Sequence, residues 1–127
     1  MSQLKLYRCS HCGKIVEIIG GCTSCPTICC GEPMKELTAN TTDAALEKHV
    51  PSVTVEGDEV RVQVGSTLHP MTKEHFIEFV ILETDKGVRR VNFTPESQPI
   101  VTFNVKGEKP LRVYEHCNLH GLWVKEL

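Results

Sequence analysis

The sequence predicts a mainly β protein, with a small cysteine-rich metal module over residues 1–37 and an antiparallel β-sandwich of immunoglobulin-like size over residues 38–127. Six of the seven cysteines lie between Cys9 and Cys30, and the next one is Cys117. From residue 51 onward, short runs of alternating apolar residues are separated by turn residues, which is typical of half-buried strands. A chain of 127 residues is long enough for one compact core and a small attached module.

Composition and the N-terminal stretch limit the class of protein. No apolar run with a small-residue cleavage site opens the chain, and no stretch reaches the roughly 18 apolar residues that a membrane span needs. We therefore expect a cytoplasmic protein, in which clustered cysteines indicate metal-bound thiolates more than disulfides. The 14 basic and 16 acidic residues give a formal net charge of -2, so we expect no nucleic-acid-binding surface.

A short helix is expected where the two parts of the chain meet. The cysteine-rich head ends near Leu37. Residues 41–43 are good N-cap types ahead of residues 44–48, and Pro51 prevents continuation, so we expect at most one or two helical turns here.

Six strands are expected beyond Pro51. Val53 and Val55 alternate with polar residues, and so do Val60, Val62 and Val64 after a turn at 56–58, which predicts a hairpin. Four further strands are predicted at residues 76–83, 88–93, 100–105 and 111–114. The segments between them carry turn residues at 85–87, 94–99 and 106–109. Short strands at this spacing predict an antiparallel sandwich.

Four histidines and one cysteine lie at or beyond the ends of these predicted elements. His49 leaves the helix, His69 lies in a loop and His75 opens a strand, while Cys117 and His120 follow the last predicted strand. Taken singly, such histidines are usually solvated or hydrogen-bonded side chains. Loops at the ends of a rigid sandwich can bring distant residues together, so a shared metal site is the simplest interpretation.

The ligand set indicates redox chemistry. Four imidazoles and one thiolate exceed the four ligands of a structural zinc and favour iron or copper. A thiolate opposite an open position donates electron density that helps activate or release a bound oxygen species. A hydrolase is less consistent with the sequence, because no nucleophile-elbow pattern surrounds Cys117.

Other metal proteins remain as alternatives. A blue-copper centre also uses a late Cys-x-x-His, but it needs only two histidines and usually adds an axial methionine or glutamine, which this chain lacks after His120. A one-electron carrier with iron or copper, and a structural protein with zinc at both sites, are further alternatives. An open coordination position would distinguish an enzyme from a carrier.

Six motifs occur together in this chain. They are Cys9-Ser10-His11-Cys12-Gly13, Cys29-Cys30-Gly31-Glu32-Pro33-Met34, Glu47-Lys48-His49-Val50-Pro51, Leu68-His69-Pro70-Met71, Glu74-His75 and Cys117-Asn118-Leu119-His120-Gly121. As a set they resemble the desulfoferrodoxin family of two-iron superoxide reductases. The resemblance covers nearly the whole chain, and it is specific because the ligand types recur in the same order with the same neighbours.

This resemblance implies a role for each residue of the larger part. It implies that His49, His69, His75 and His120 are equatorial ligands of a catalytic iron, with Cys117 axial and the sixth position open to superoxide. Lys48 would attract the anion and organise the water that donates protons, and Glu47 would occupy the vacant position in the ferric state. The implied reaction is one-electron reduction of superoxide to hydrogen peroxide, with re-reduction by a donor protein such as rubredoxin.

The resemblance also implies a desulforedoxin-like head and a cytoplasmic homodimer. The four thiolates implied for an iron, or a zinc, in the head are those of Cys9, Cys12, Cys29 and Cys30. That metal either relays electrons or only stabilises a module too small to fold alone. His11 and His116 have no implied role.

The head departs from the family pattern at Cys22 and Cys25, which form a second Cys-x-x-Cys. By spacing alone, this pair and Cys9-x-x-Cys12 would make an acceptable zinc knuckle pair. We favour the set that ends in adjacent cysteines, because that motif is the more distinctive. Cys22 and Cys25 are then a surface thiol pair, free or able to form a disulfide.

Overall fold

The structure is a computed structural model that describes residues 4–22, 24–41 and 46–127, apart from the side chain of Glu47. The chain divides into two compact units, Met1–Thr38 and Ala39–Leu127. Within the described ranges, no helix is long and apolar enough to cross a membrane.

The smaller unit contains five short strands and little buried apolar surface. β1 (Leu6–Arg8) pairs antiparallel with β2 (Ile15–Glu17) and with β5 (Lys35–Glu36), and β3 (Ile28–Cys29) pairs with β4 (Glu32–Pro33). In the described part of this unit, only Leu6, Cys9 and Met34 are buried. A unit of this size commonly needs a metal or a disulfide to fold.

A two-residue turn carries the adjacent cysteines of the smaller unit. Cys29 pairs with Glu32, so Cys30 and Gly31 are the central residues of the β3–β4 turn. Both have a positive φ, 53° at Cys30 and 78° at Gly31, as a type I′ hairpin turn requires. Glycine adopts this conformation without steric cost, and the turn presents two neighbouring thiols at the tip of one hairpin.

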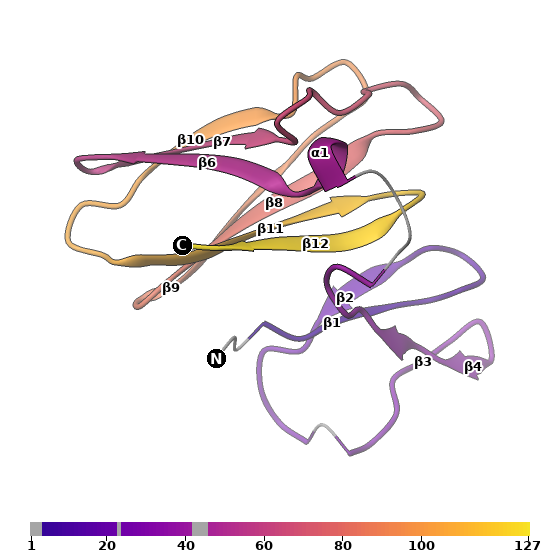
Figure 1. The fold of residues 1–127 in the computed structure, drawn as a ribbon. Helices are drawn as coiled ribbons and strands as arrows, with labels where there is room; N and C mark the ends of the chain where they lie inside the picture. Colours follow the sequence, from indigo (N-terminus) through magenta and orange to yellow (C-terminus); the bar gives the residue numbers. More distant parts are fainter. Residues whose placement is uncertain (1–3, 23, 42–45) are drawn as a thin grey trace. The chain divides into compact units, whose positions relative to one another are not determined.

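The larger unit is a sandwich of two antiparallel sheets with a single helical turn (Figure 1). One sheet has the order β10-β7-β6 and the other has the order β12-β11-β8-β9. The elements are α1 (Leu46–His49), β6 (Pro51–Glu56), β7 (Glu59–Val64), β8 (Ile77–Thr84), β9 (Gly87–Asn92), β10 (Ile100–Asn104), β11 (Pro110–Cys117) and β12 (Gly121–Glu126). The predicted mainly β fold class is confirmed.

The core of the sandwich follows the period-two pattern of the sequence. Val60, Val62 and Val64 are fully buried on one face of β7 and meet residues of the opposite sheet. The buried cluster contains Val60, Val62, Val64, Ile77, Val80, Leu82, Phe103, Val105, Val113 and Cys117. Cys117 belongs to this cluster, so a candidate metal ligand packs against buried apolar side chains.

The structure corrects the prediction for the C-terminal segment. Strand β11 continues through Cys117, and the chain then returns as β12, whose residues pair with β11 from Cys117↔Gly121 to Arg112↔Glu126. The predicted last strand ended at Tyr114, and no strand was predicted after His120. Leu122 and Trp123 are consecutive and both buried, so β12 lacks the simple alternation by which strands are recognised.

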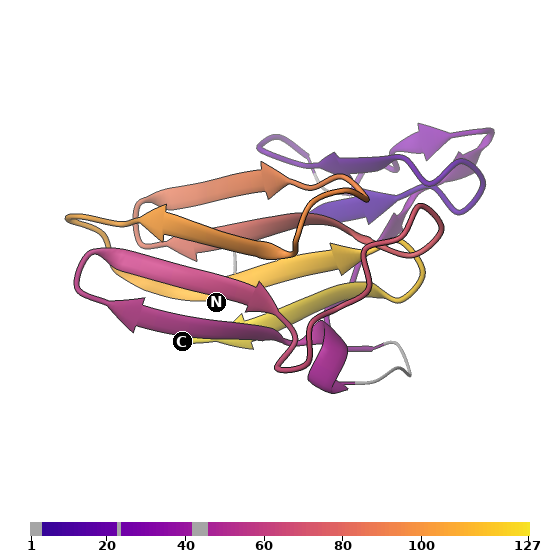
Figure 2. The ribbon, with the colours of Figure 1, turned by 90° about the horizontal axis from the view of Figure 1, so that it is seen from above.

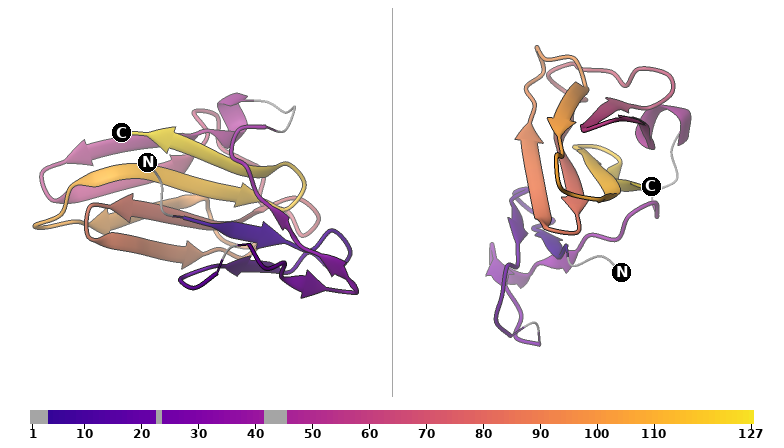
Figure 3. Two further views of the ribbon diagram at one scale, coloured as in Figure 1. Left: turned by 90° about the horizontal axis from the view of Figure 1, so that it is seen from below. Right: turned by 90° about the vertical axis from the view of Figure 1, so that its left-hand side faces the viewer.

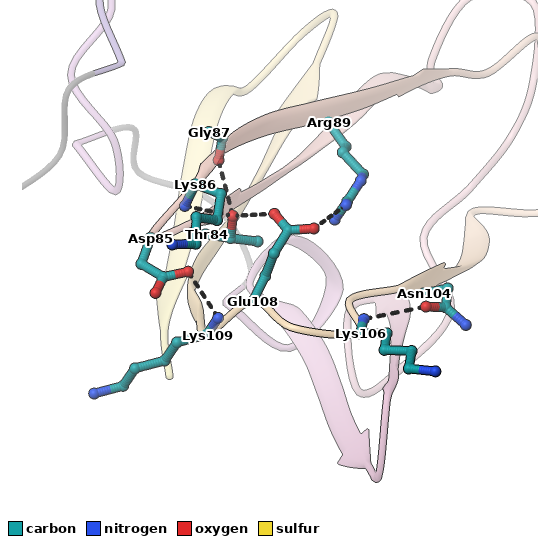
Figure 4. A network of polar contacts seen from close by, with 9 residues as sticks. All are labelled: Thr84, Asp85, Lys86, Gly87, Arg89, Asn104, Lys106, Glu108 and Lys109. Carbon is teal, nitrogen blue, oxygen red and sulfur yellow. Dashed lines mark hydrogen bonds and ion pairs between the residues drawn. The ribbon is translucent and has the colours of Figure 1, made fainter.

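The two sheets end in loops at both ends, and one end is fixed by a polar network (Figure 4). Thr84 donates its hydroxyl to Glu108 at 2.7 Å, Arg89 forms an ion pair with Glu108, and the amide of Lys109 donates to Asp85 at 2.8 Å. These contacts join the β8–β9 turn to the β10–β11 connection. β8 runs from Ile77 to Thr84, so this network lies at the Thr84 end of the strand. The predicted histidine ligands belong to the opposite end, near Ile77.

Candidate metal centres

The five predicted ligands of the larger unit come together at that opposite end. α1, the β7–β8 connection and the β11–β12 turn lie at the same end of the sandwich (Figure 1, Figure 2). α1 ends at His49, the β7–β8 connection carries His69 and His75, β11 ends at Cys117, and the following turn carries His120. One ligand atom from each of the first four residues lies within 4.8 Å of the others.

The four imidazole rings form a square. Neighbouring ring centroids are 4.7 Å apart for His49 and His69, 4.7 Å for His69 and His75, 5.0 Å for His75 and His120, and 4.8 Å for His120 and His49. Each of these neighbours is nearly perpendicular to the next, and the diagonal from His49 to His75 is 6.4 Å. Four rings placed edge to face in this way can direct one nitrogen each toward a common centre.

The spacing of the nitrogens fits a bound metal ion. The Nε2 atom of His49 lies 3.2 Å from Nε2 of His69 and 3.1 Å from Nδ1 of His120. Two nitrogens at right angles on a metal about 2.1 Å away would be about 3.0 Å apart. The buried Nε2 of His75 has no hydrogen-bond partner among the described residues, and a metal ion at the centre of the square would satisfy it.

The environment of His69 and His75 keeps these two side chains neutral, as metal ligands must be. Burial lowers the pKa of His69 to about 4, with a smaller contribution from the neighbouring imidazoles, and burial also lowers the pKa of His75. His69 donates Nδ1–H to the carbonyl oxygen of Pro70 at 2.7 Å. The proton is assigned to Nδ1 because a carbonyl oxygen can only accept a hydrogen bond. That hydrogen bond leaves the lone pair of Nε2 directed at the centre.

Cys117 lies on the inner side of the histidine square. Its Sγ is 3.8 Å from Nδ1 of His120, and the residue is fully buried within the hydrophobic core. Burial raises the pKa of the Cys117 thiol, the nearby carboxyl groups of Glu115 and Glu78 act in the same direction, and the backbone amides of Leu119 and His120 oppose them. A metal cation would supply the charge that this buried thiolate needs.

Two residues without a predicted role position the ligands. Asn118 accepts from the amide of Phe76 at 3.0 Å and donates to the carbonyl of Glu74 at 2.9 Å, so it links the β11–β12 turn to the segment around His75. Trp123 stacks on His49 with centroids 5.0 Å apart and donates to the carbonyl of His120 at 3.1 Å. The hydrogen bonds of Asn118 and the stacking of Trp123 on His49 join segments far apart in the sequence, which spacing does not reveal.

The remaining polar candidates of the larger unit differ in position. Lys48 is exposed in the last turn of α1, and its charge contributes to the lowered pKa of His75. Glu47 belongs to the same helix, but its side chain lies outside the described residues. His116 points Nδ1 at Glu78 at 2.8 Å and stacks on Phe79, so it is not part of the square.

The smaller unit brings together the four cysteines predicted for its metal. Ligand atoms of Cys9, Cys12, Cys29 and Cys30 lie within 4.8 Å of one another. The sulfurs of Cys12 and Cys29 are 3.7 Å apart, and those of Cys29 and Cys30 are 4.0 Å apart. A tetrahedron with metal–sulfur bonds of about 2.3 Å has sulfurs about 3.8 Å apart, so the spacing fits a single ion.

Ionisation of one thiol in this group opposes ionisation of its neighbours. Hydrogen bonds, first from the backbone amide of Cys12, lower the pKa of Cys9 to about 6. The neighbouring sulfur of Cys12, followed by that of Cys9, raises the pKa of Cys29, and the same two neighbours raise the pKa of Cys30 to about 12. A metal that neutralises the accumulated charge would allow all four to bind as thiolates.

Neither the second Cys-x-x-Cys nor His11 joins this group. The sulfurs of Cys22 and Cys25 contact each other at 3.4 Å, and the cluster of four does not include them. His11 forms a contact of 2.9 Å with Glu32. The zinc knuckle pairing considered from sequence is therefore not the arrangement of this structure.

Comparison with known proteins gives the same family throughout. The family model described as desulfoferrodoxin matches residues 41–126. Desulfoferrodoxin of Syntrophotalea carbinolica is 43% identical over 125 residues, which cover 98% of this chain and 97% of that protein. Superoxide reductase of Pyrococcus furiosus is 34% identical over 108 residues, covering 64% of this chain and 87% of that protein. The crystal structure of the superoxide reductase from Treponema pallidum superposes with a TM-score of 0.81 at 36% identity, covering 98% of this chain and 100% of that one.

Proposed function

The chain belongs to the desulfoferrodoxin family, and from that premise we propose that it is a superoxide reductase. The observation that carries the proposal is the square of four imidazoles closed on its inner side by a buried cysteine. Five donors arranged in this way leave one face of the square for a small ligand. The crystal structure that superposes over nearly the whole chain is itself of a superoxide reductase.

We propose that His49, His69, His75, His120 and Cys117 hold iron in the larger unit. Iron supplies the one-electron chemistry that reduces superoxide, with the thiolate adding electron density to it. The overall reaction takes one superoxide, one electron and two protons to hydrogen peroxide, and it forms no dioxygen.

We propose that Lys48 acts at the face of the histidine square opposite Cys117. Cys117 is fully buried, whereas His75 is partly exposed and its pKa is affected by the charge of Lys48. The influence of Lys48 on His75 supports placing its positive charge on the side where an anion would enter, on a chain of net charge -2. Its ammonium group attracts superoxide and orients the water that donates protons, and Glu47 is proposed to occupy the vacant position in the ferric state.

We propose that residues 1–37 form a four-cysteine metal module and that residues 38–127 form the catalytic domain. In the module, Cys9, Cys12, Cys29 and Cys30 would hold iron, with zinc as the alternative, because their spacing suits a tetrahedral ion. We also propose a cytoplasmic location, where reducing conditions keep cysteines available as metal ligands.

We propose an electron donor protein such as rubredoxin and a homodimeric assembly, as the family resemblance implies. Three large apolar side chains within three residues of site histidines are exposed, namely Leu46, Leu68 and Leu119. Exposed apolar residues beside a redox centre suit the brief docking of a donor. Light scattering of the purified protein tests the dimer, and anaerobic re-reduction of the oxidised protein by rubredoxin tests the donor.

The proposed function is tested by spectroscopy combined with product analysis. In oxidised wild type we expect a thiolate-to-ferric charge-transfer band of the larger unit that is absent in Cys117→Ser and retained in the control Cys22→Ser, while any bands of iron bound by the four cysteines of the smaller unit remain in all three proteins. Reduced wild type mixed with superoxide should release one hydrogen peroxide per superoxide and no dioxygen. Azide should bind to the oxidised protein, whereas a coordinatively saturated electron carrier would bind none. A colourless zinc protein, or a blue copper one, would contradict the proposal.

A further inference from the structure

The second Cys-x-x-Cys of the smaller unit is a close, exposed pair of thiols that neither metal group uses. Cys22 and Cys25 are both exposed and free, and their sulfurs are 3.4 Å apart. The described part of the β2–β3 connection, which carries them, extends away from the strands of this unit (Figure 1 and the right-hand view of Figure 3). The two sulfurs need to approach by little more than 1 Å to reach the about 2.05 Å of a disulfide bond.

The two thiols are chemically unequal. The hydroxyl of Ser24 lies 2.9 Å from the sulfur of Cys22. This hydrogen bond, followed by those from Cys25 and from the backbone amides of Ser24 and Cys25, lowers the pKa of Cys22 to about 7. An attacking thiol is most effective when its pKa is close to the ambient pH, so the hydrogen bond from Ser24 selects Cys22 as the attacking group.

Both thiols line a small hollow on the surface of the unit. Its volume is about 110 Å³, and it is bounded by Tyr7, Ile18, Cys22, Ser24, Cys25, Pro26, Thr27 and Met34. None of these residues is a lysine, an arginine or a carboxylate. The pKa of Cys22 is therefore lowered by hydrogen bonds and not by a cation, and an incoming group meets an uncharged wall with both polar and apolar side chains.

We propose that Cys22 and Cys25 form a redox-active dithiol that reduces accessible disulfides, with Cys22 as the attacking thiol and Cys25 as the resolving thiol. The inference requires no metal in the larger unit and is independent of superoxide reduction. It adds a thiol–disulfide exchange site to a chain whose metal ligands are accounted for without these two residues.

The exchange proceeds in two balanced steps. The thiolate of Cys22 attacks one sulfur of a disulfide, so a mixed disulfide forms and one thiolate of the substrate leaves. The thiolate of Cys25 then attacks Cys22, which forms the Cys22–Cys25 disulfide and releases the second thiolate of the substrate. Two electrons pass from the protein to the substrate, and a dithiol reductant such as dithiothreitol reverses the change.

The test uses the metal-loaded full-length chain, so that the other cysteines are protected, and glutathione disulfide as the probe. Intact-mass and peptide analysis follow the products in wild type, Cys22→Ser and Cys25→Ser. We expect wild type to end as the Cys22–Cys25 disulfide without bound glutathione. Cys25→Ser should retain one glutathione on residue 22, and Cys22→Ser should react at least about 10-fold more slowly, because the thiol with the lowered pKa is absent.

A second measurement follows the reactivity of Cys22 itself with pH. The rate of its alkylation by iodoacetamide should rise with a midpoint near pH 7 in Cys25→Ser. In the double variant Cys25→Ser/Ser24→Ala the midpoint should move to higher pH, and in the control Cys25→Ser/Ser52→Ala it should stay. Metal content and the superoxide reaction are measured in parallel and should be unchanged.

Three outcomes would overturn the proposal. They are a stable glutathione adduct on wild type, the absence of any adduct on Cys25→Ser, and an alkylation midpoint that Ser24→Ala leaves in place. None of them bears on superoxide reduction, which would fail separately through loss of the charge-transfer band or of peroxide formation.

Discussion

At the scale of single residues, the ligands of the larger unit could be predicted but the groups that hold them could not. His49, His69, His75, Cys117 and His120 stand out because metal-binding side chains recur at the ends of predicted strands. Asn118 lies inside a motif that sequence analysis singled out, yet its hydrogen bonds reach residues 42 and 44 positions away. Only the folded chain shows such partners.

Replacing Asn118 should loosen the metal site without removing a ligand. Asn118→Ala loses the hydrogen bonds to the amide of Phe76 and the carbonyl of Glu74, which together contribute about 1–3 kcal/mol at the usual value for such bonds. We expect a lower midpoint in urea denaturation and a reduced iron content after mild chelation. Leu119→Ala, which truncates an exposed neighbour, is the control and should resemble wild type. Equal iron retention in both variants would show that the hydrogen bonds do not position the site.

Lys48 is the residue whose effect should be electrostatic. We expect Lys48→Ala to slow the reaction with superoxide by about 10-fold at low salt and to reduce its dependence on ionic strength, because a local charge attracts the anion. Pulse radiolysis at several salt concentrations measures both effects. Lys86→Ala removes the same charge from the β8–β9 turn at the other end of the strands and should leave the rate unchanged. A loss of similar size in both variants would indicate that net charge, not position, controls the rate.

At the scale of elements, the hairpins with clear alternation were predictable and the last strand was not. The hairpin of β6 and β7 has turn residues between alternating valines, and its pairing from Pro51↔Val64 to Glu56↔Glu59 agrees with that pattern. β12 has two consecutive buried residues and follows a motif that reads as a loop. Its partner β11 extends to Cys117 because hydrogen bonding to β8 and β12 continues past the predicted end.

The network between the β8–β9 turn and the β10–β11 connection should contribute to stability in a pH-dependent way. The hydroxyl of Thr84 and then Arg89 hold the pKa of Glu108 below its usual value. A carboxylate with a lowered pKa stabilises the fold above its unfolded pKa, near 4.5, and this stabilisation is lost as the pH falls through its folded pKa. We therefore expect Glu108→Gln to lower Tm by a few degrees at neutral pH, with a difference that disappears in acid.

Thermal denaturation by circular dichroism across this pH range measures the effect of Glu108→Gln. Glu96→Gln changes an exposed carboxylate in the loop before β10 and serves as the control, with Tm expected to match wild type at each pH. If the difference in Tm between Glu108→Gln and wild type stayed constant down to acid pH, the network would depend on the shape of the side chain at position 108 and not on its charge.

At the scale of the whole molecule, the two units differ in what holds them together. The larger unit has a continuous core of buried residues from both sheets, which the period-two pattern of the sequence predicts. The described part of the smaller unit buries only Leu6, Cys9 and Met34. One of these three is a metal ligand candidate, so the folding of this unit should depend on its metal.

Loss of the metal bound by the four cysteines should therefore unfold the smaller unit and leave the larger one folded. In hydrogen exchange by mass spectrometry, we expect Cys9→Ser to lose protection in β1 and β2 while β8 and β11 stay protected, because the sandwich has its own core. Cys22→Ser alters a thiol outside the metal group and should keep protection in both units, which separates the loss of metal from the loss of any cysteine. If β1 and β2 stayed protected in metal-free Cys9→Ser, packing around Leu6 and Met34 would have to hold the unit together. The metal of the smaller unit would then be a bound ion and not the source of the fold.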